Sequence, residues 1–326
     1  MNIKLLPIML SGVALASTVS TAYAADTTNK LYGKAVVSLQ SHEEDASGTQ
    51  ENAWKLATHA SRIGVKGDIK IDEDLKVVYK VEYEIYLDDG DDGKGGKSEF
   101  KQRNTFLGLK GGWGTVFAGV HDTPLKTAQG KVDKFNDITD IKIVLDGENR
   151  MPNVMQYSTP KFGGGFTAKV MTILGEDNDP TADEGGLADH ISASLTYKTK
   201  QMWAAIAIDD DVKGMDIMRV ATEYNSGKFT VGAIYQESES VATGNSQEGV
   251  IISGSVKASK GYTVKAQFGS SDQKIAGGDM FSLGVDKKLG KKTKIFAYYT
   301  AVGATASADE ETIFGFGVQH KFSSTL

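Results

Sequence analysis

The segment Leu75–Leu87 alternates between apolar and charged side chains. Every odd-numbered position is apolar or aromatic, whereas the even-numbered positions include Lys76, Lys80, Glu82 and Glu84. Successive side chains of a β-strand point to opposite faces, so this pattern predicts a strand with one apolar and one charged face. Alternation by itself fits two folds. In a soluble sandwich one face packs inward, and in a transmembrane barrel the apolar face contacts lipid.

The same alternation recurs along the chain and predicts an all-β fold. In Tyr262–Phe268, for example, Tyr262, Val264 and Phe268 alternate with Thr263 and Lys265. Sixteen strands are expected near residues 31–40, 54–69, 75–87, 100–110, 114–121, 153–159, 165–174, 189–198, 201–208, 216–224, 228–237, 249–258, 262–269, 280–288, 292–302 and 312–322.

The connections between these strands alternate in length. Short turns include Lys70–Asp74, Gly111–Trp113, Thr199–Lys200, Asn225–Gly227, Ser259–Gly261 and Leu289–Lys291. Long loops include Ser41–Ala53, Asp88–Glu99, His121–Pro152, Gly175–Ala188, Asp209–Met215 and Ser238–Glu248. Short turns on one side, long loops on the other and an even strand count are typical of an outer-membrane barrel. We therefore expect a 16-stranded antiparallel transmembrane β-barrel, wide enough to hold an aqueous channel.

The third long connection, residues 121–152, is the longest segment without a predicted strand. Its acidic residues are interleaved with lysines around apolar Phe135, Ile138 and Leu145. A long unpaired segment inside a compact fold is a functional loop, a disordered segment or a wrong strand assignment. We expect this segment to fold into the lumen of the barrel and to narrow a water-filled pore.

The N-terminus predicts export. Lys4 is the only charged residue before Asp26, Leu5–Val19 is mostly apolar or small, and Ala22-Tyr23-Ala24 provides small residues for cleavage. Residues 1–24 are thus expected to be a signal peptide. No later segment has the roughly 20 apolar residues of a membrane-spanning helix. The formal charge is −6, which disfavours a nucleic-acid partner, and the absence of cysteine excludes disulfides.

Several short strings resemble a known family when their order is considered. They are Ser61–Gly67, Phe106–Gly111, Trp113–Gly119, Asp122–Leu125, Glu148–Arg150 with Asn153, Tyr157–Phe162 and Gly317–Phe322. Over essentially the whole of residues 25–326 the chain resembles the Gram-negative general diffusion porins of the trimeric, sixteen-stranded type. It departs from that family at Val120, where Arg is frequent, and at Ser323–Leu326, which follow Phe322 where the family usually ends.

The resemblance implies a function and a set of partners. It implies passive diffusion of ions and small hydrophilic solutes through a homotrimer in the outer membrane of a Gram-negative bacterium. Contact with outer-membrane lipid and lipopolysaccharide follows from that location. It also implies that the third long loop lies inside the barrel, with its acidic residues facing basic residues of the wall.

Strand parity selects the candidate residues of the pore constriction. Ile63 and Val65 are expected to face lipid, which turns Arg62 and Lys66 toward the lumen. Lys80 and Arg150 point inward by the same argument, whereas Arg103 shares the parity of two leucines. We expect the constriction to comprise Arg62, Lys66, Lys80, Arg103 and Arg150 on the wall, and Asp133, Asp137, Asp140 and Glu148 on the loop. Such charges determine which ions enter a pore.

The sequence offers little for catalysis or for a cofactor. None of the five histidines forms a metal-spaced pair, and no nucleophile motif is present. His121 and Asp122 are adjacent, so on a strand they would point to opposite faces. The turn Asp88–Gly93 is rich in carboxylates but lacks the bidentate Glu of a calcium loop, which favours a solvated loop. We expect no catalytic residue, cofactor or metal site.

Three alternatives remain open from the sequence alone. A substrate-selective channel would show saturable flux. An outer-membrane barrel hydrolase would lose activity on replacement of His121 or His190. A secreted all-β binding protein would be extracted without detergent. The nearly balanced charge of residues 121–152 does not indicate an ion preference.

Overall fold

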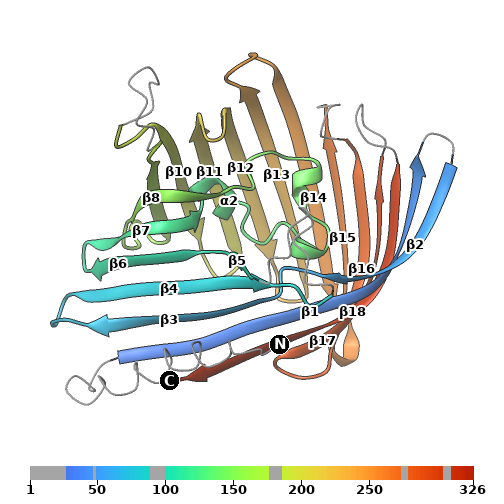
Figure 1. Ribbon diagram of the computed structural model, residues 1–326, viewed down its shortest axis with the longest axis horizontal. Helices are drawn as coiled ribbons and strands as arrows, with labels where there is room; N and C mark the ends of the chain where they lie inside the picture. The colour runs from blue at the N-terminus through green and yellow to red at the C-terminus, as the bar shows by residue number, and fades with distance from the viewer. Residues whose placement is uncertain (1–26, 47–48, 89–99, 176–185, 273–277, 304–309) are drawn as a thin grey trace, which may run out of the picture.

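The structure is a computed structural model that describes residues 27–46, 49–88, 100–175, 186–272, 278–303 and 310–326. The expected signal peptide and most of Asp88–Gly93 lie outside these residues. Eighteen β-segments form one antiparallel sheet (Figure 1). Their bounds are β1 Thr27–Ala46, β2 Thr49–Thr58, β3 Arg62–Lys70, β4 Lys76–Ile85, β5 Phe100–Gln102, β6 Thr105–Gly111, β7 Gly114–Asp122, β8 Arg150–Ser158, β9 Phe166–Ile173, β10 His190–Lys198, β11 Met202–Asp210, β12 Met215–Asn225, β13 Phe229–Ser240, β14 Ser246–Lys257, β15 Tyr262–Ser271, β16 Met280–Lys288, β17 Thr293–Val302 and β18 Glu311–Thr325.

The sheet closes on itself because its first and last strands pair. β1 and β18 are in register from Lys30 opposite Thr325 to Glu44 opposite Glu311. On its other side β1 pairs first with β3 and then, further along, with β2, and β4 pairs likewise with β6 and then with β5. The eighteen segments therefore occupy sixteen strand positions. This confirms the predicted 16-stranded antiparallel barrel, whose closure leaves no unpaired edge.

Two strands predicted as continuous are each interrupted, which corrects the assignments of 54–69 and 100–110. Val37 lies opposite Thr58 and Lys34 opposite Arg62, so three steps along β1 match four along β2 and β3. The strand that pairs with β4 is interrupted in the same way, at residues 103–104 between β5 and β6. One extra residue reverses which side chains face the lumen.

The two rims of the barrel differ as predicted, but several hairpins reach further than expected. Strand β1 extends to Ala46 and β2 begins at Thr49, so Ser41–Ala53 is a long hairpin rather than a loop. Asp209–Met215 and Ser238–Glu248 are likewise shorter connections, of residues 211–214 and 241–245.

The C-terminal residues continue strand β18 rather than forming a tail. Ser323 lies opposite Tyr32 and Ser324 opposite Leu31, so these residues take part in the closure of the barrel. Strand β1 therefore begins, and strand β18 ends, on the rim of the short turns. Within the described residues the helices are only three or four residues long, among them the 3-10 helix η4 (Ser259–Gly261). In the part of the chain that the structure describes, no helix is long and apolar enough to cross a membrane.

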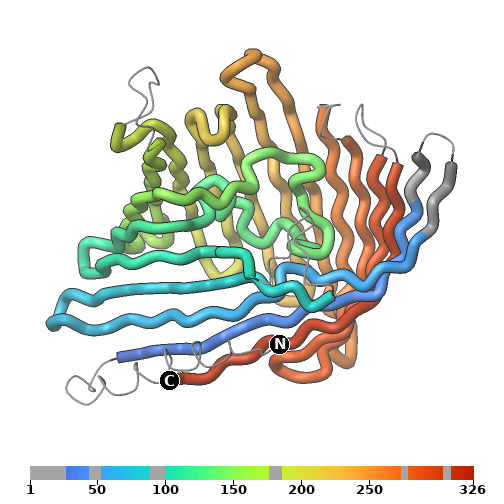
Figure 2. Tube along the Cα trace, viewed as in Figure 1, coloured from blue at the N-terminus to red at the C-terminus, as the bar shows by residue number. Residues whose placement is uncertain are grey.

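The lipid-facing wall carries the apolar residues predicted by the alternation. Exposed outward residues include Leu107, Leu283, Ile295, Phe314 and Phe316. Three of the four clusters of buried hydrophobic residues lie on the opposite side of the sheet, between the wall and the segment that joins β7 to β8. Figure 2 shows that this segment folds inside the curve of the sheet instead of extending beyond its rim.

Candidate pore constriction

The segment between β7 and β8, residues 123–149, enters the lumen through a short helix, α2 (Pro124–Thr127). The Oγ1 of Thr123 accepts a hydrogen bond from the backbone N–H of Lys126 at 3.1 Å, and proline occupies the first turn. Both features are typical of a helix start. Leu125 and Ala128 then pack against β11 and β12 on Ala205, Ala207 and Ile217. We call residues 123–149 the constriction loop.

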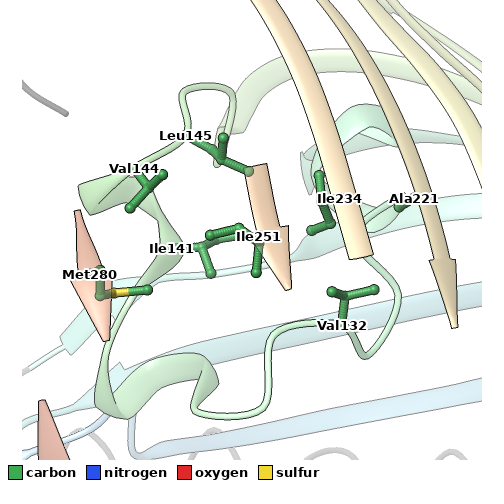
Figure 3. Close-up of a cluster of buried hydrophobic side chains, with 8 residues drawn as sticks. All are labelled: Val132, Ile141, Val144, Leu145, Ala221, Ile234, Ile251 and Met280. Atoms are coloured by element: carbon green, nitrogen blue, oxygen red, sulfur yellow. The ribbon is translucent and has the colours of Figure 1, made fainter. Parts of the chain in front are cut away.

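The middle of the constriction loop has a hydrophobic core of its own with the wall. Four loop residues, Val132, Ile141, Val144 and Leu145, pack against Ala221, Ile234, Ile251 and Met280 of strands β12, β13, β14 and β16 (Figure 3). The loop residues are at most 1% exposed. Burial of such side chains stabilises the docked loop by about 1.5–3 kcal/mol each. A segment with this packing occupies one position rather than many.

Hydrogen bonds from inward-facing side chains hold the loop backbone on the same wall. The hydroxyl of Ser253 donates to the carbonyl of Val132 at 2.5 Å, and Gln247 donates to the carbonyl of Val144 at 3.0 Å. Gln267 accepts from the N–H of Lys134 at 2.8 Å. The irregular loop backbone is therefore satisfied by strand side chains.

The tip of the loop crosses to the first strands of the barrel. Around the 3-10 helix η2 (Asn136–Ile138), Phe135 packs with Val36, Phe296 and Tyr298. The carboxylate of Asp137 lies 2.5 Å from the Nζ of Lys34 and 3.3 Å from a guanidinium nitrogen of Arg62. The loop tip is thus held to β1 and β17 by apolar packing, and to β1 and β3 by two ion pairs.

A second anchor lies near the end of the loop. Arg219 of β12 is fully buried, and its Nη1 lies 2.7 Å from the carboxylate of Glu148. The same guanidinium donates to the carbonyl of Asp146 at 2.8 Å and to the side chain of Gln236 at 2.8 Å. Because the guanidinium is planar and carries several N–H groups, these three contacts hold it in one orientation.

The wall that faces the loop across the lumen carries a chain of ion pairs. Glu82 of β4 lies 3.2 Å from Lys80 and 3.2 Å from Arg103, and it accepts a hydrogen bond from Tyr32 at 2.7 Å. Arg103 also contacts Glu84 at 2.5 Å. Arg103 points inward because the extra residue between β5 and β6 separates its parity from that of Leu107.

The two ends of the constriction loop are joined by a third group of charges. Asp122 at the end of β7 lies 3.0 Å from Arg150 at the start of β8 and 3.7 Å from Lys126. Asn104 donates to Asp122 at 2.9 Å and accepts from Arg150 at 2.8 Å. In all, six bases contact four carboxylates, Asp122, Asp137, Glu82 and Glu84, in the described part of the constriction.

The structure places the residues expected at the constriction in different surroundings. Arg62, Lys80, Arg103, Arg150 and Asp137 belong to the ion pairs described above. Lys66 lies nearer the short turns, with its Nζ 5.0 Å from the ring centroid of Tyr32. Glu148 is buried beside Arg219, on the docked side of the loop. Asp133 accepts hydrogen bonds from Phe135 and Asn136, and Asp140 caps the 3-10 helix η3 (Ile141–Ile143).

Several residues of these networks were not selected from the sequence. The alternation turns Lys34, Glu82 and Glu84 inward but does not distinguish them from other luminal charges. Asp122, at the end of β7, lies beyond a register shift in which two steps along β7, from Gly119 to His121, match three along β8. Arg219 is the one arginine outside β3–β8. Because arginine suits buried ion pairs, its residue type alone indicates a candidate anchor for a loop carboxylate.

Burial changes the acidity of three carboxyl groups in the constriction loop. It raises the pKa of Asp133 to about 7, in spite of the two backbone N–H groups that donate to it. It also raises the pKa of Asp146 and of Glu148, the latter against the opposing effect of Arg219. Desolvation disfavours the ionised carboxylate, so these groups bind protons more tightly in the docked loop than in water.

Neither a metal centre nor a histidine-based catalytic site is evident in the described residues. No three His, Asp or Glu side chains there are grouped to hold a metal ion. The Nδ1 of His121 lies 2.7 Å from the backbone oxygen of Asp122, not from its carboxylate, and its ring packs on Phe106 and Phe117. His190 lies 3.7 Å from Asp211 at the rim of the long loops.

Solved structures share this fold. The anion-selective porin from Comamonas acidovorans superimposes with a TM-score of 0.74 at 21% identity, over 91% of this chain and 100% of that one. OmpT of Vibrio cholerae in its trimer form superimposes with a TM-score of 0.65 at 17% identity, over 91% and 100%.

Sequence comparisons give the family. Major outer membrane protein P.IB of Neisseria gonorrhoeae is 27% identical over 218 residues, 64% of this chain and 56% of that protein. The chain thus spans less than two thirds of that relative's length. The protein of the same name from Neisseria lactamica is 22% identical over 303 residues, 82% of this chain and 85% of that protein. The family model described as Gram-negative porin matches residues 11–326, and the chain belongs to that family.

Proposed function

We propose that this protein forms a water-filled channel in the outer membrane through which ions and small hydrophilic solutes diffuse passively. The observation that carries the proposal is the position of the constriction loop. The loop is docked mainly on β11–β17, so its apolar side chains are buried, whereas Lys80, Glu82 and Arg103 of the wall across the lumen pair with one another and not with the loop. In this proposal the barrel forms a wide tube, and the constriction loop determines the diameter of the opening through it.

We further propose an anion preference. At the constriction six bases contact four carboxylates, which leaves a positive excess. Among the described residues, Lys30, Lys66 and Lys110 on the adjoining luminal wall have no ion pair at all. One structural neighbour is itself an anion-selective porin. Charged side chains that line a pore determine at close range which ions enter it.

The assembly and processing of the chain follow from the same proposal. A homotrimer is supported by the trimer form of the OmpT neighbour. Removal of residues 1–24 as a signal peptide would deliver the mature chain to the outer membrane, where its apolar outer wall meets lipid and, in the outer leaflet, lipopolysaccharide. A channel rather than an enzyme is the function that the family supports.

Single-channel recording in a planar bilayer tests the proposal. Detergent-extracted protein should give current steps that scale with salt concentration, and in a salt gradient the reversal potential should have the sign of anion preference. Arg62→Ala should shift that potential toward cations, because it removes one of the bases at the constriction. A folded, inserted protein that gives no steps would refute the open channel and favour a barrel hydrolase.

A further inference from the structure

The luminal wall on the short-turn side of the constriction contains a hollow of about 520 Å³. It is formed by β1, β3, β4, β6 and β7. Lys30 of β1 lies opposite Lys66 of β3, Lys66 lies opposite Lys80 of β4, and Lys80 lies opposite Phe106 of β6. Residues directly opposite one another share a face of the sheet, and neighbouring strands are about 4.8 Å apart. Three lysines and one phenylalanine therefore form a continuous row across the hollow.

The phenylalanine end of this row is rigid. The ring of Phe106 lies 4.5 Å from that of Phe117 and 5.5 Å from that of His121, and Phe117 lies 4.8 Å from His121. Phe117 is buried against Val154 and Met171, so it supports Phe106 from behind. Phe106 and His121 line the hollow. A solute in the lumen thus contacts a fixed aromatic surface, although most of a water-filled lumen is lined by polar side chains.

The lysine end of the row carries an excess of positive charge. The hollow is lined by five lysines and one acid, Asp68, which accepts a hydrogen bond from Lys76 at 2.8 Å. Lys80 shares Glu82 with Arg103. Within the described residues no carboxylate pairs with Lys30, Lys66 or Lys110, and these ammonium groups remain available to an anion from solution.

Extending the proposed channel function, we propose that this hollow is a luminal binding subsite for carboxylates that bear an aromatic ring. The carboxylate would bind between Lys66 and Lys80, because charge-assisted hydrogen bonds to an anion are the stronger kind. The ring would lie against Phe106 in an edge-to-face or offset arrangement, which such rings prefer. The row then orients the solute across the wall just outside the constriction. Binding has to remain weak, since a solute that passes must also leave.

The experiment measures block of the chloride current through single channels by three sodium salts. Benzoate has the charge and the ring, cyclohexanecarboxylate has the charge and a similar size without aromaticity, and acetate has the charge alone. We expect the half-blocking concentration to rise in that order. Phe106→Ala should raise the value for benzoate about 2- to 10-fold, from the usual worth of an aromatic pair, and leave that for acetate unchanged.

Matched variants separate the subsite from general charge. Lys66→Gln and Lys30→Gln should each weaken block by benzoate, and the second gives an independent reading if the first does not fold. Lys161→Gln, on a short turn outside the hollow, and Phe229→Ala, on the outer wall, should leave it unchanged. If benzoate and cyclohexanecarboxylate block equally and Phe106→Ala does not change their block, the subsite is refuted. The channel function would still stand in that case, because chloride current steps would still be observed. Absence of steps in every salt would instead refute the channel itself.

Discussion

Replacement of Arg219 by methionine should release the constriction loop from the wall. The guanidinium is the partner of Glu148 at 2.7 Å and of the Asp146 carbonyl at 2.8 Å, and none of it is exposed. The Asp146 carbonyl retains a hydrogen bond from Gln236 at 3.1 Å, whereas Glu148 keeps only the bond from Gln129 and would be a buried charge without a counter-ion. The substitution therefore destabilises the docked loop mainly by removing the partner of the Glu148 carboxylate.

Removal of one partner of a buried ion pair costs about 3–5 kcal/mol. If the loop opens locally from its anchor at Glu148, the open population should increase about 150- to 5,000-fold. Because the pKa of Glu148 is already raised by burial, acid should restore docking in this variant by protonating the carboxyl group. The double variant Arg219→Met/Glu148→Leu removes both charges and should dock nearly as well as the wild type, since apolar replacements of buried pairs are often neutral.

Limited proteolysis by trypsin measures this opening. The loop lysines, among them exposed Lys142, are cleaved only when the docked backbone opens, so the cleavage rate follows the open population. We expect fast cleavage of Arg219→Met within the loop, near wild-type cleavage of the double variant, and intermediate cleavage of Arg219→Lys, which keeps the charge without the planar fork. Cleavage of Arg219→Met within about threefold of the wild-type rate would contradict the assignment of Arg219 as an anchor.

Three further predictions concern the same loop. Asp137→Asn should shift the reversal potential further toward anions, because it leaves two bases of the wall without their carboxylate. Ile141→Ala should weaken loop docking by about 2–5 kcal/mol and broaden the distribution of single-channel conductances, because it removes a fully buried side chain. The proton on Asp133 should stabilise the docked loop fully below the ordinary pKa of 3.8, and this contribution should be lost as the pH rises through about 7. Hydrogen exchange of loop amides, corrected for intrinsic rates, should show that loss, and Asp133→Asn should abolish it.

Each of these predictions has an outcome that contradicts it. An unchanged reversal potential in Asp137→Asn would mean that Asp137 does not compensate the wall charges. Conductance in Ile141→Ala as uniform as in the wild type would show that the loop core does not hold the diameter. Retention of the pH dependence in Asp133→Asn, or its loss in the exposed control Asp210→Asn, would assign the titration to another group.

The barrel could be predicted from the sequence because its cause is local and repeated. Alternation in segments such as Leu75–Leu87 separates an apolar face from a polar one, and the spacing of short turns and long loops indicates a membrane barrel and its strand count. The interruptions at residues 59–61 and 103–104 could not be predicted in the same way. A single inserted residue needs no glycine or proline, and at the first interruption it is Ala60 that takes a positive φ of 45°.

The constriction was harder to predict for a different reason. That the loop enters the lumen follows from its length and charge, but which acid reaches the wall depends on tight 3-10 turns. Asp133 and Asp137 are four residues apart, yet one accepts hydrogen bonds from its own backbone and the other crosses to Lys34 and Arg62. Side-chain directions within such turns are set by packing of Phe135 on residues remote in the sequence.

Most of the apolar packing of the constriction loop is with one half of the barrel, and this separates two kinds of change available to this chain. Strands β11–β17 carry the small and apolar inward residues that fit the loop, so Ala207, Ile234 or Ile251 can change only together with their loop partners. Across the lumen, Lys66 and Lys80 of β3 and β4 have no part in that packing. Substitutions at Lys66 and Lys80, unlike those at Arg62, which holds Asp137 of the loop tip, can therefore retune which solutes pass without loosening the aperture, and new permeability can arise there one residue at a time.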